Sequence, residues 1–129
     1  MFGFFKKKDQ KEQNNIVQEE KVDKDALEKR LSQVVEKLSS VTDDEELAKL
    51  HEEKGLIEAD LDLVDEAIQS LEKSLDLKVS IGDGYKRLLN LYNKKRAQAA
   101  KSGDDDAINY YINKFDEMKA VAKKGTLSK

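Results

Sequence analysis

Apolar residues recur at steps of three and four from residue 25 onward, which is the spacing of one face of an α-helix. The pattern predicts a first helix over 25–41 and a second from residue 43 to a turn at 60–62. Three more helices are expected over 63–78, 84–102 and 105–124. The clearest stripe lies in the first helix and consists of Leu27, Leu31, Val34, Leu38 and Val41.

The boundary between the second and third helices has two interpretations. A turn at Asp60-Leu61-Asp62, with Asp62 as the cap of the third helix, separates two helices. The apolar positions also fit an unbroken 3.5-residue period, typical of one long coiled-coil helix over 43–78. That period would place Lys54 in the apolar seam and Gly55 beside it. We therefore expect two helices.

Polar and glycine residues mark the other helix ends. Thr42 and Glu45 have the spacing of a capping box at the start of the second helix. The segment 80–84 contains two glycines and predicts a break. Ser102-Gly103-Asp104 predicts a turn, with Gly103 ending one helix and Asp104 capping the next. Gly125 is expected to end the last helix.

The composition supports helices and excludes several other classes. The chain has 129 residues, of which 40% are charged, with no Pro, Cys or Trp and only six Gly. All-β folds, disulfide scaffolds and thiolate metal sites are therefore excluded. No segment approaches the roughly 20 apolar residues that span a bilayer, and the N-terminus does not resemble a secretory signal. We expect a cytoplasmic protein.

Charge is distributed unevenly along the chain. The net charge of −3 combines an excess of ten acids in 22–85 with an excess of six bases in 86–129 and one in 1–21. Such a dipolar chain can orient self-association or attract a charged partner.

The expected organisation is an N-terminal arm, a helical domain and a short tail. Residues 1–24 are predicted to be a flexible arm, because few aliphatic side chains are present to offset the cost of ordering it. The helical domain covers 25–124, and residues 125–129 are expected to fray.

Two segments of the chain repeat each other. Leu47-x-x-Leu50-His51 precedes Leu88-x-x-Leu91-Tyr92 by 41 residues. Asp65-Glu66-Ala67-Ile68 precedes Asp105-Asp106-Ala107-Ile108 by 40 residues. A helical hairpin repeated at this spacing is typical of an α-solenoid.

These segments resemble tetratricopeptide repeats (TPRs). Residues 66–77 resemble the second helix of such a repeat, residues 103–111 its turn and second helix, and Leu88-x-x-Leu91-Tyr92 its first-helix signature. The first helices are about two turns longer than usual, and neither Pro nor Trp marks the repeats. The resemblance implies an all-α protein of antiparallel hairpins stacked as a short TPR-like α-solenoid, with helix 25–41 as a cap or half-repeat. It also implies a non-catalytic adaptor or scaffold function.

The helix predicted over 84–102 is strongly basic. TPR proteins that bind peptides line their groove with the first helices of the repeats, and some hold a partner's terminal carboxylate with Lys and Asn. The resemblance thus implies binding of an acidic peptide or protein by this helix. The alternatives are a solvated face, self-association with the acidic middle of the chain and, with least support, nucleic acid. The candidate partner-binding residues are Lys86, Arg87, Asn90 and Lys94.

The N-terminal tip combines aromatic and basic residues. It is a candidate for reversible contact with an anionic membrane surface, which makes a peripheral membrane-associated helical bundle the alternative function. Docking onto a partner or onto the protein's own helices is a further interpretation, as is no role. The tip residues are Phe2, Phe4, Phe5, Lys6, Lys7 and Lys8.

No other pattern predicts chemistry. His51 is the only histidine, so we interpret it as a packing residue. The acidic clusters at 60–66 and 104–106 lack the central Gly of a calcium loop and lie where helices begin, so we interpret them as structural. We expect no catalysis, no metal and no cofactor.

Overall fold

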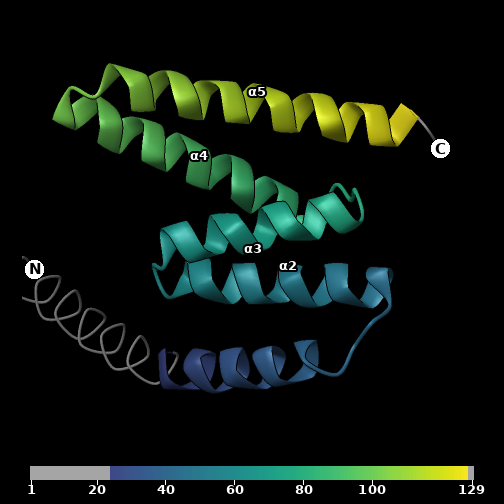
Figure 1. Ribbon diagram of the computed structural model, residues 1–129. Helices are drawn as coiled ribbons and strands as arrows, with labels where there is room; N and C mark the ends of the chain where they lie inside the picture. Colours follow the sequence, from purple (N-terminus) through teal and green to yellow (C-terminus); the bar gives the residue numbers. More distant parts are fainter. Residues whose placement is uncertain (1–23, 128–129) are drawn as a thin grey trace, which may run out of the picture.

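The computed structural model describes residues 24–127, with side chains through residue 124, and this part of the chain contains five α-helices and no strand (Figure 1). The all-α prediction with five helices is confirmed. The predicted flexible arm lies almost wholly outside the described residues. The helices are 24–38, α2 (Asp44–Asp60), α3 (Val64–Leu77), α4 (Asp83–Ser102) and α5 (Asp105–Leu127).

Successive helices run in opposite directions and lie side by side (Figure 1). α2 packs most extensively against α3, and α4 against α5, so the chain forms two antiparallel hairpins. α4 also contacts both α2 and α3, which joins the hairpins. The helix over 24–38 lies along α2 on the side away from α3.

The chain does double back between α2 and α3, so one long helix over 43–78 is excluded. Asp62 has a positive φ of 63° in the turn, and the Leu63 amide donates to the Glu58 carbonyl at 2.8 Å. The prediction that Asp62 caps α3 is wrong. The cap residue is Leu63, which has no side-chain cap bond, and the Asp62 carboxylate instead contacts Lys94 of α4.

Gly55 lets α2 and α3 approach each other closely. A Cβ atom at this position would lie 2.6 Å from Leu71 Cγ and 3.2 Å from the Ala67 carbonyl oxygen. Both distances are shorter than ordinary contact, so only glycine fits without movement of α3. The residue that disturbs a coiled-coil period is therefore the one that the hairpin requires.

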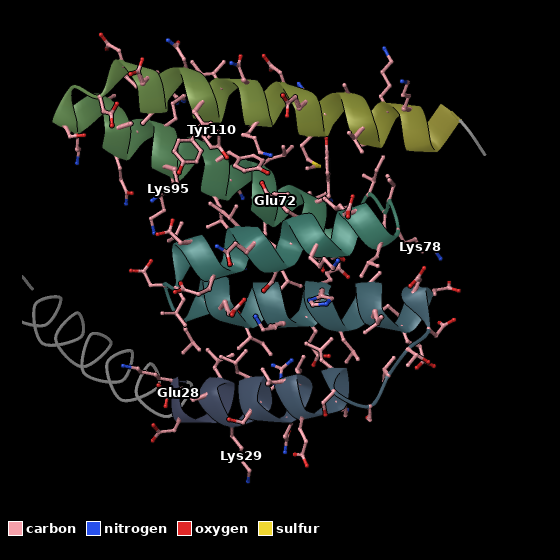
Figure 2. The ribbon with its side chains drawn as sticks, in the orientation of Figure 1. Glu28, Lys29, Glu72, Lys78, Lys95 and Tyr110 are labelled. Carbon is pink, nitrogen blue, oxygen red and sulfur yellow. The ribbon has the colours of Figure 1, made fainter. Side chains whose placement is uncertain are left out.

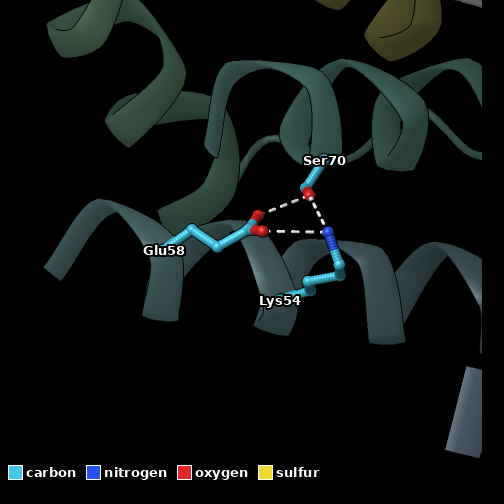
Figure 3. A network of polar contacts seen from close by, with 3 residues as sticks. All are labelled: Lys54, Glu58 and Ser70. Carbon is cyan, nitrogen blue, oxygen red and sulfur yellow. Dashed lines mark hydrogen bonds and ion pairs between the residues drawn. The ribbon is translucent and has the colours of Figure 1, made fainter. Parts of the chain in front are cut away.

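A polar network crosses the same interface (Figure 3). Lys54 Nζ lies 2.9 Å from Glu58 Oε2 and donates to Ser70 Oγ at 3.0 Å. The Ser70 hydroxyl donates to Glu58 Oε1 at 2.6 Å. Because each polar group has a partner, the cost of burying the Glu58 carboxylate is offset.

The main apolar core lies between α3 and α4. Tyr92, Leu71 and Leu88 are its largest fully buried side chains, and burial of each leucine contributes roughly 1.5–3 kcal/mol. The Tyr92 hydroxyl donates to the Glu72 carboxylate. The core residues are Ala67, Ile68, Leu71, Leu75, Leu88, Leu91 and Tyr92.

Several helix ends differ from the predictions. Asp43, not Thr42, caps α2, and its carboxylate accepts from the Glu46 amide at 3.0 Å. The first helix ends at residue 38, not 41, and the next two residues are serines whose hydroxyls bond to preceding carbonyls. α5 passes through Gly125 to Leu127, because one glycine costs a helix only about 1 kcal/mol.

The turn between α4 and α5 was predicted correctly. Gly103 adopts a left-handed conformation at the end of α4, and the Asp104 carboxylate accepts from the Ala107 amide at 3.1 Å. Near the end of α5 the buried residue is Ala122, whereas the neighbouring Val121 is 41% exposed.

Candidate partner-binding groove

An acidic turn contacts the basic face of α4. Arg87 Nη1 lies 2.9 Å from Asp60 Oδ1, and Lys94 Nζ lies 2.9 Å from Asp62 Oδ1. One residue further along α4, Lys95 Nζ lies 2.9 Å from Asp65 Oδ1. The acidic middle and the basic helix thus meet within one molecule.

These ion pairs change the status of two predicted binding residues. Arg87 and Lys94 were expected to be available to a partner, but each is paired with the turn between α2 and α3. The sequence carried no signal for this pairing, because Asp62 and Lys94 are 32 residues apart. Both cations therefore join the hairpins instead of standing free.

Three of the four predicted residues, Lys86, Arg87 and Asn90, line a groove between α2 and α4, and Arg87 does so while paired with Asp60 in the same groove. The groove has a volume of about 480 Å³ and includes Lys86 and Asn90 from α4. Lys49 and Glu52 contribute from α2, and Arg30 contributes from the helix over 24–38. The predicted first helices of both repeats thus form opposite walls of one groove.

Lys49 is a groove residue that the predicted binding set does not include. It is exposed and, like Lys86, forms no ion pair with any residue that the structure describes. The 41-residue repeat already relates Lys49 to Asn90, so a signal was present. The groove therefore presents the exposed ammonium groups of Lys49 and Lys86 and the exposed amide of Asn90. The guanidinium groups of Arg30 and Arg87 also line it, each paired with a carboxylate.

Acidic side chains share this groove. Glu53 lies 3.5 Å from Arg30, and both are exposed enough for the pair to be weak. Glu52 accepts a hydrogen bond from the Gly84 amide at 3.1 Å, and Asp83 lies in the first turn of α4. The groove thus suits a ligand that places its negative charge at the two lysines and away from these carboxylates.

His51 and the second acidic cluster offer no competing site. Burial, together with the nearby charges of Lys54 and Lys73, lowers the pKa of His51, so the imidazole is neutral near pH 7. Asp104 acts as a helix cap. Within residues 24–127, no three His, Cys, Asp or Glu side chains gather in a way that could hold a metal ion.

The membrane-contact prediction falls on residues that the structure does not describe. The tip residues Phe2, Phe4, Phe5 and Lys6 to Lys8 all lie outside the described range. None of the described helices is both long and apolar enough to cross a bilayer.

Comparison with known proteins identifies no relative of this chain. No protein family, no curated protein and no solved structure matches the chain.

Proposed function

We propose that this protein is a non-catalytic adaptor of TPR-like architecture that binds an acidic peptide segment of a partner protein between α2 and α4. The observation that carries the proposal is the position of Lys49, Lys86 and Asn90 around one groove. Electrostatic attraction would speed association and select acidic partners over basic ones.

The packing of the first hairpin supports the TPR-like part of the proposal. The TPR pattern has a Gly in its first helix and Ala-x-x-x-Phe in its second. Gly55 and Ala67-x-x-x-Leu71 supply these residue types, in a register seven residues beyond the one that aligns His51 with Tyr92. A Cβ at Gly55 would contact both Ala67 and Leu71. The resemblance is therefore carried by residues at a position where α2 and α3 approach each other closely.

The test measures binding of fluorescent peptides of matched length, one rich in Asp and Glu and one rich in Lys. We expect the acidic peptide to bind more tightly, and its affinity to fall as salt rises from 50 to 300 mM. The double variant Lys49→Glu/Lys86→Glu should weaken binding by at least about 10-fold, because two attractive charges become repulsive.

A matched control uses Lys29→Glu, which changes an exposed lysine on the outer side of the first helix (Figure 2). This variant should bind as the wild type does. Equal binding of both peptides, or equal loss in the control and the double variant, would contradict the proposal.

The peripheral membrane function remains an alternative that rests on the tip alone. Flotation with anionic vesicles should compare the full chain with a variant in which Phe2, Phe4 and Phe5 are serine. Equal flotation of the two proteins would remove this alternative.

A further inference from the structure

The start of α4 has no cap of its own. Its cap residue is Gly82, which offers no side-chain acceptor, so the first amides of the helix lack a local partner. The Gly84 amide instead donates to Glu52 Oε2, at 3.1 Å, from the middle of α2. The carboxylate also lies at the positive end of the α4 dipole, where a negative charge is stabilised.

Gly84 is needed for this contact. A Cβ atom there would lie 2.5 Å from Glu52 Oε2 and 2.7 Å from Glu52 Cγ. The overlap falls on the carboxylate group itself, so any larger residue would displace Glu52 from the helix start. The Glu52 side chain and the bare Gly84 backbone thus form one contact between the two hairpins.

This contact lies inside the proposed binding groove. Lys49 precedes Glu52 by about one turn of α2, and Lys86 follows Gly84 by two residues in α4. All three side chains, those of Lys49, Glu52 and Lys86, line the same groove. A shift in the start of α4 would therefore move Lys86 relative to Lys49.

We propose that Glu52 is the positioning and selectivity residue of the α2–α4 groove. Its hydrogen bond to Gly84 holds the start of α4 against α2 and so fixes the separation of the two lysines. Its negative charge repels acidic groups of a ligand that lie beside it. The groove therefore accepts a peptide only when its acidic side chains lie at the two lysines and away from Glu52. The selectivity part rests on the proposed binding of acidic peptides.

Three variants separate the hydrogen bond from the charge. Glu52→Gln keeps an acceptor for Gly84 and removes the charge, whereas Glu52→Ala removes both. Gly84→Ala keeps the charge and displaces the side chain. The readouts are hydrogen exchange of the residue-84 amide, measured by NMR, and the dissociation constant of the acidic peptide.

We expect Glu52→Gln to retain amide protection and to bind the acidic peptide about 3- to 10-fold more tightly at 50 mM salt. Glu52→Ala and Gly84→Ala should each lose amide protection by about 10-fold or more. Gly84→Ala should bind at least about 3-fold more weakly than the wild type, because the repulsive charge remains while the geometry is lost.

Two results would overturn the proposal. Amide protection in Glu52→Ala equal to that of the wild type would remove the positioning role, whether or not any peptide binds. Binding by Glu52→Gln no tighter than that of the wild type would remove the selectivity role. If the wild type binds no acidic peptide, the proposed function and the selectivity role both fall, and the amide exchange still decides the positioning role.

Discussion

The two hairpins occupy corresponding places in the predicted repeat, yet different contacts hold their helices together. α2 and α3 are shorter than α4 and α5 but pack more extensively. A glycine contact and a buried polar network lie between them. Among the described residues, no ion pair joins α4 to α5.

The charges of the second hairpin point toward the first. Lys94 and Lys95 of α4 pair with the turn between α2 and α3 and the start of α3, and Lys114 of α5 lies 3.4 Å from Glu72 of α3. The Lys95 amine also lies over the ring of Tyr111, which is a contact within the second hairpin. Polar groups thus cross both interfaces, while the apolar core between α3 and α4 supplies most of the burial that joins the second hairpin to the first.

The largest expected effect comes from breaking the buried network of the first hairpin. Glu58→Ala should lower the free energy of unfolding by about 3 kcal/mol, because Lys54 and Ser70 lose a buried partner. Urea unfolding measures this change. The control variant Glu46→Gln changes an exposed carboxylate and should lower the free energy of unfolding far less. If the two variants lowered it equally, burial would not be the cause.

A smaller effect is expected from filling the contact between α2 and α3. Gly55→Ala should destabilise the protein by about 1–3 kcal/mol, since the new methyl group would overlap Leu71. Gly82→Ala is the comparison variant, because a Cβ there has no atom within 4 Å, and the poorer helix cap that alanine makes should cost less than about 1 kcal/mol. Thermal unfolding of both variants checks the prediction, and equal melting temperatures would contradict it.

The contact between Tyr92 and Glu72, which joins the two hairpins, should make the free energy of unfolding decrease at high pH. Burial and the Glu72 carboxylate raise the pKa of Tyr92, and Tyr110 and Glu117 add to the effect. A pKa raised in the folded state means that the stabilisation is present below the ordinary value near 10 and is lost as the pH rises above it.

Tyr92→Phe isolates this contribution. The variant should lose about 1 kcal/mol at neutral pH through the missing hydrogen bond, and its stability should fall less steeply above pH 10. If the free energy of unfolding fell with the same slope in Tyr92→Phe and the wild type between pH 9 and 11, Tyr92 would not titrate with unfolding.

The smallest expected effect comes from the exposed ion pairs that join the hairpins. Lys94→Gln should cost a few tenths of a kcal/mol, because Asp62 is largely exposed to solvent. The difference from the wild type should disappear in 1 M salt. A cost above about 1 kcal/mol that persists in salt would indicate that Lys94 acts through packing.

Helical periodicity predicted the elements well because it depends on neighbours three and four residues apart. Gly103 and Asp104 were assigned correctly from local turn chemistry. Asp62 was assigned wrongly, because its local preference for a cap competes with a partner on α4. Lys49 was missing from the predicted binding residues for a related reason, since its proximity to Lys86 depends on how α2 and α4 pack.

The sequence by itself determined five helices, the two hairpin turns and the excess of basic residues on α4. Tertiary structure decided which of those basic residues form ion pairs and which line the groove, and Arg87 does both. It also decided that Glu52 caps a helix 32 residues away and that Lys54 reaches Ser70. The physical reason is that helix formation uses local bonds, whereas each of these contacts depends on the separation of helices that only packing sets.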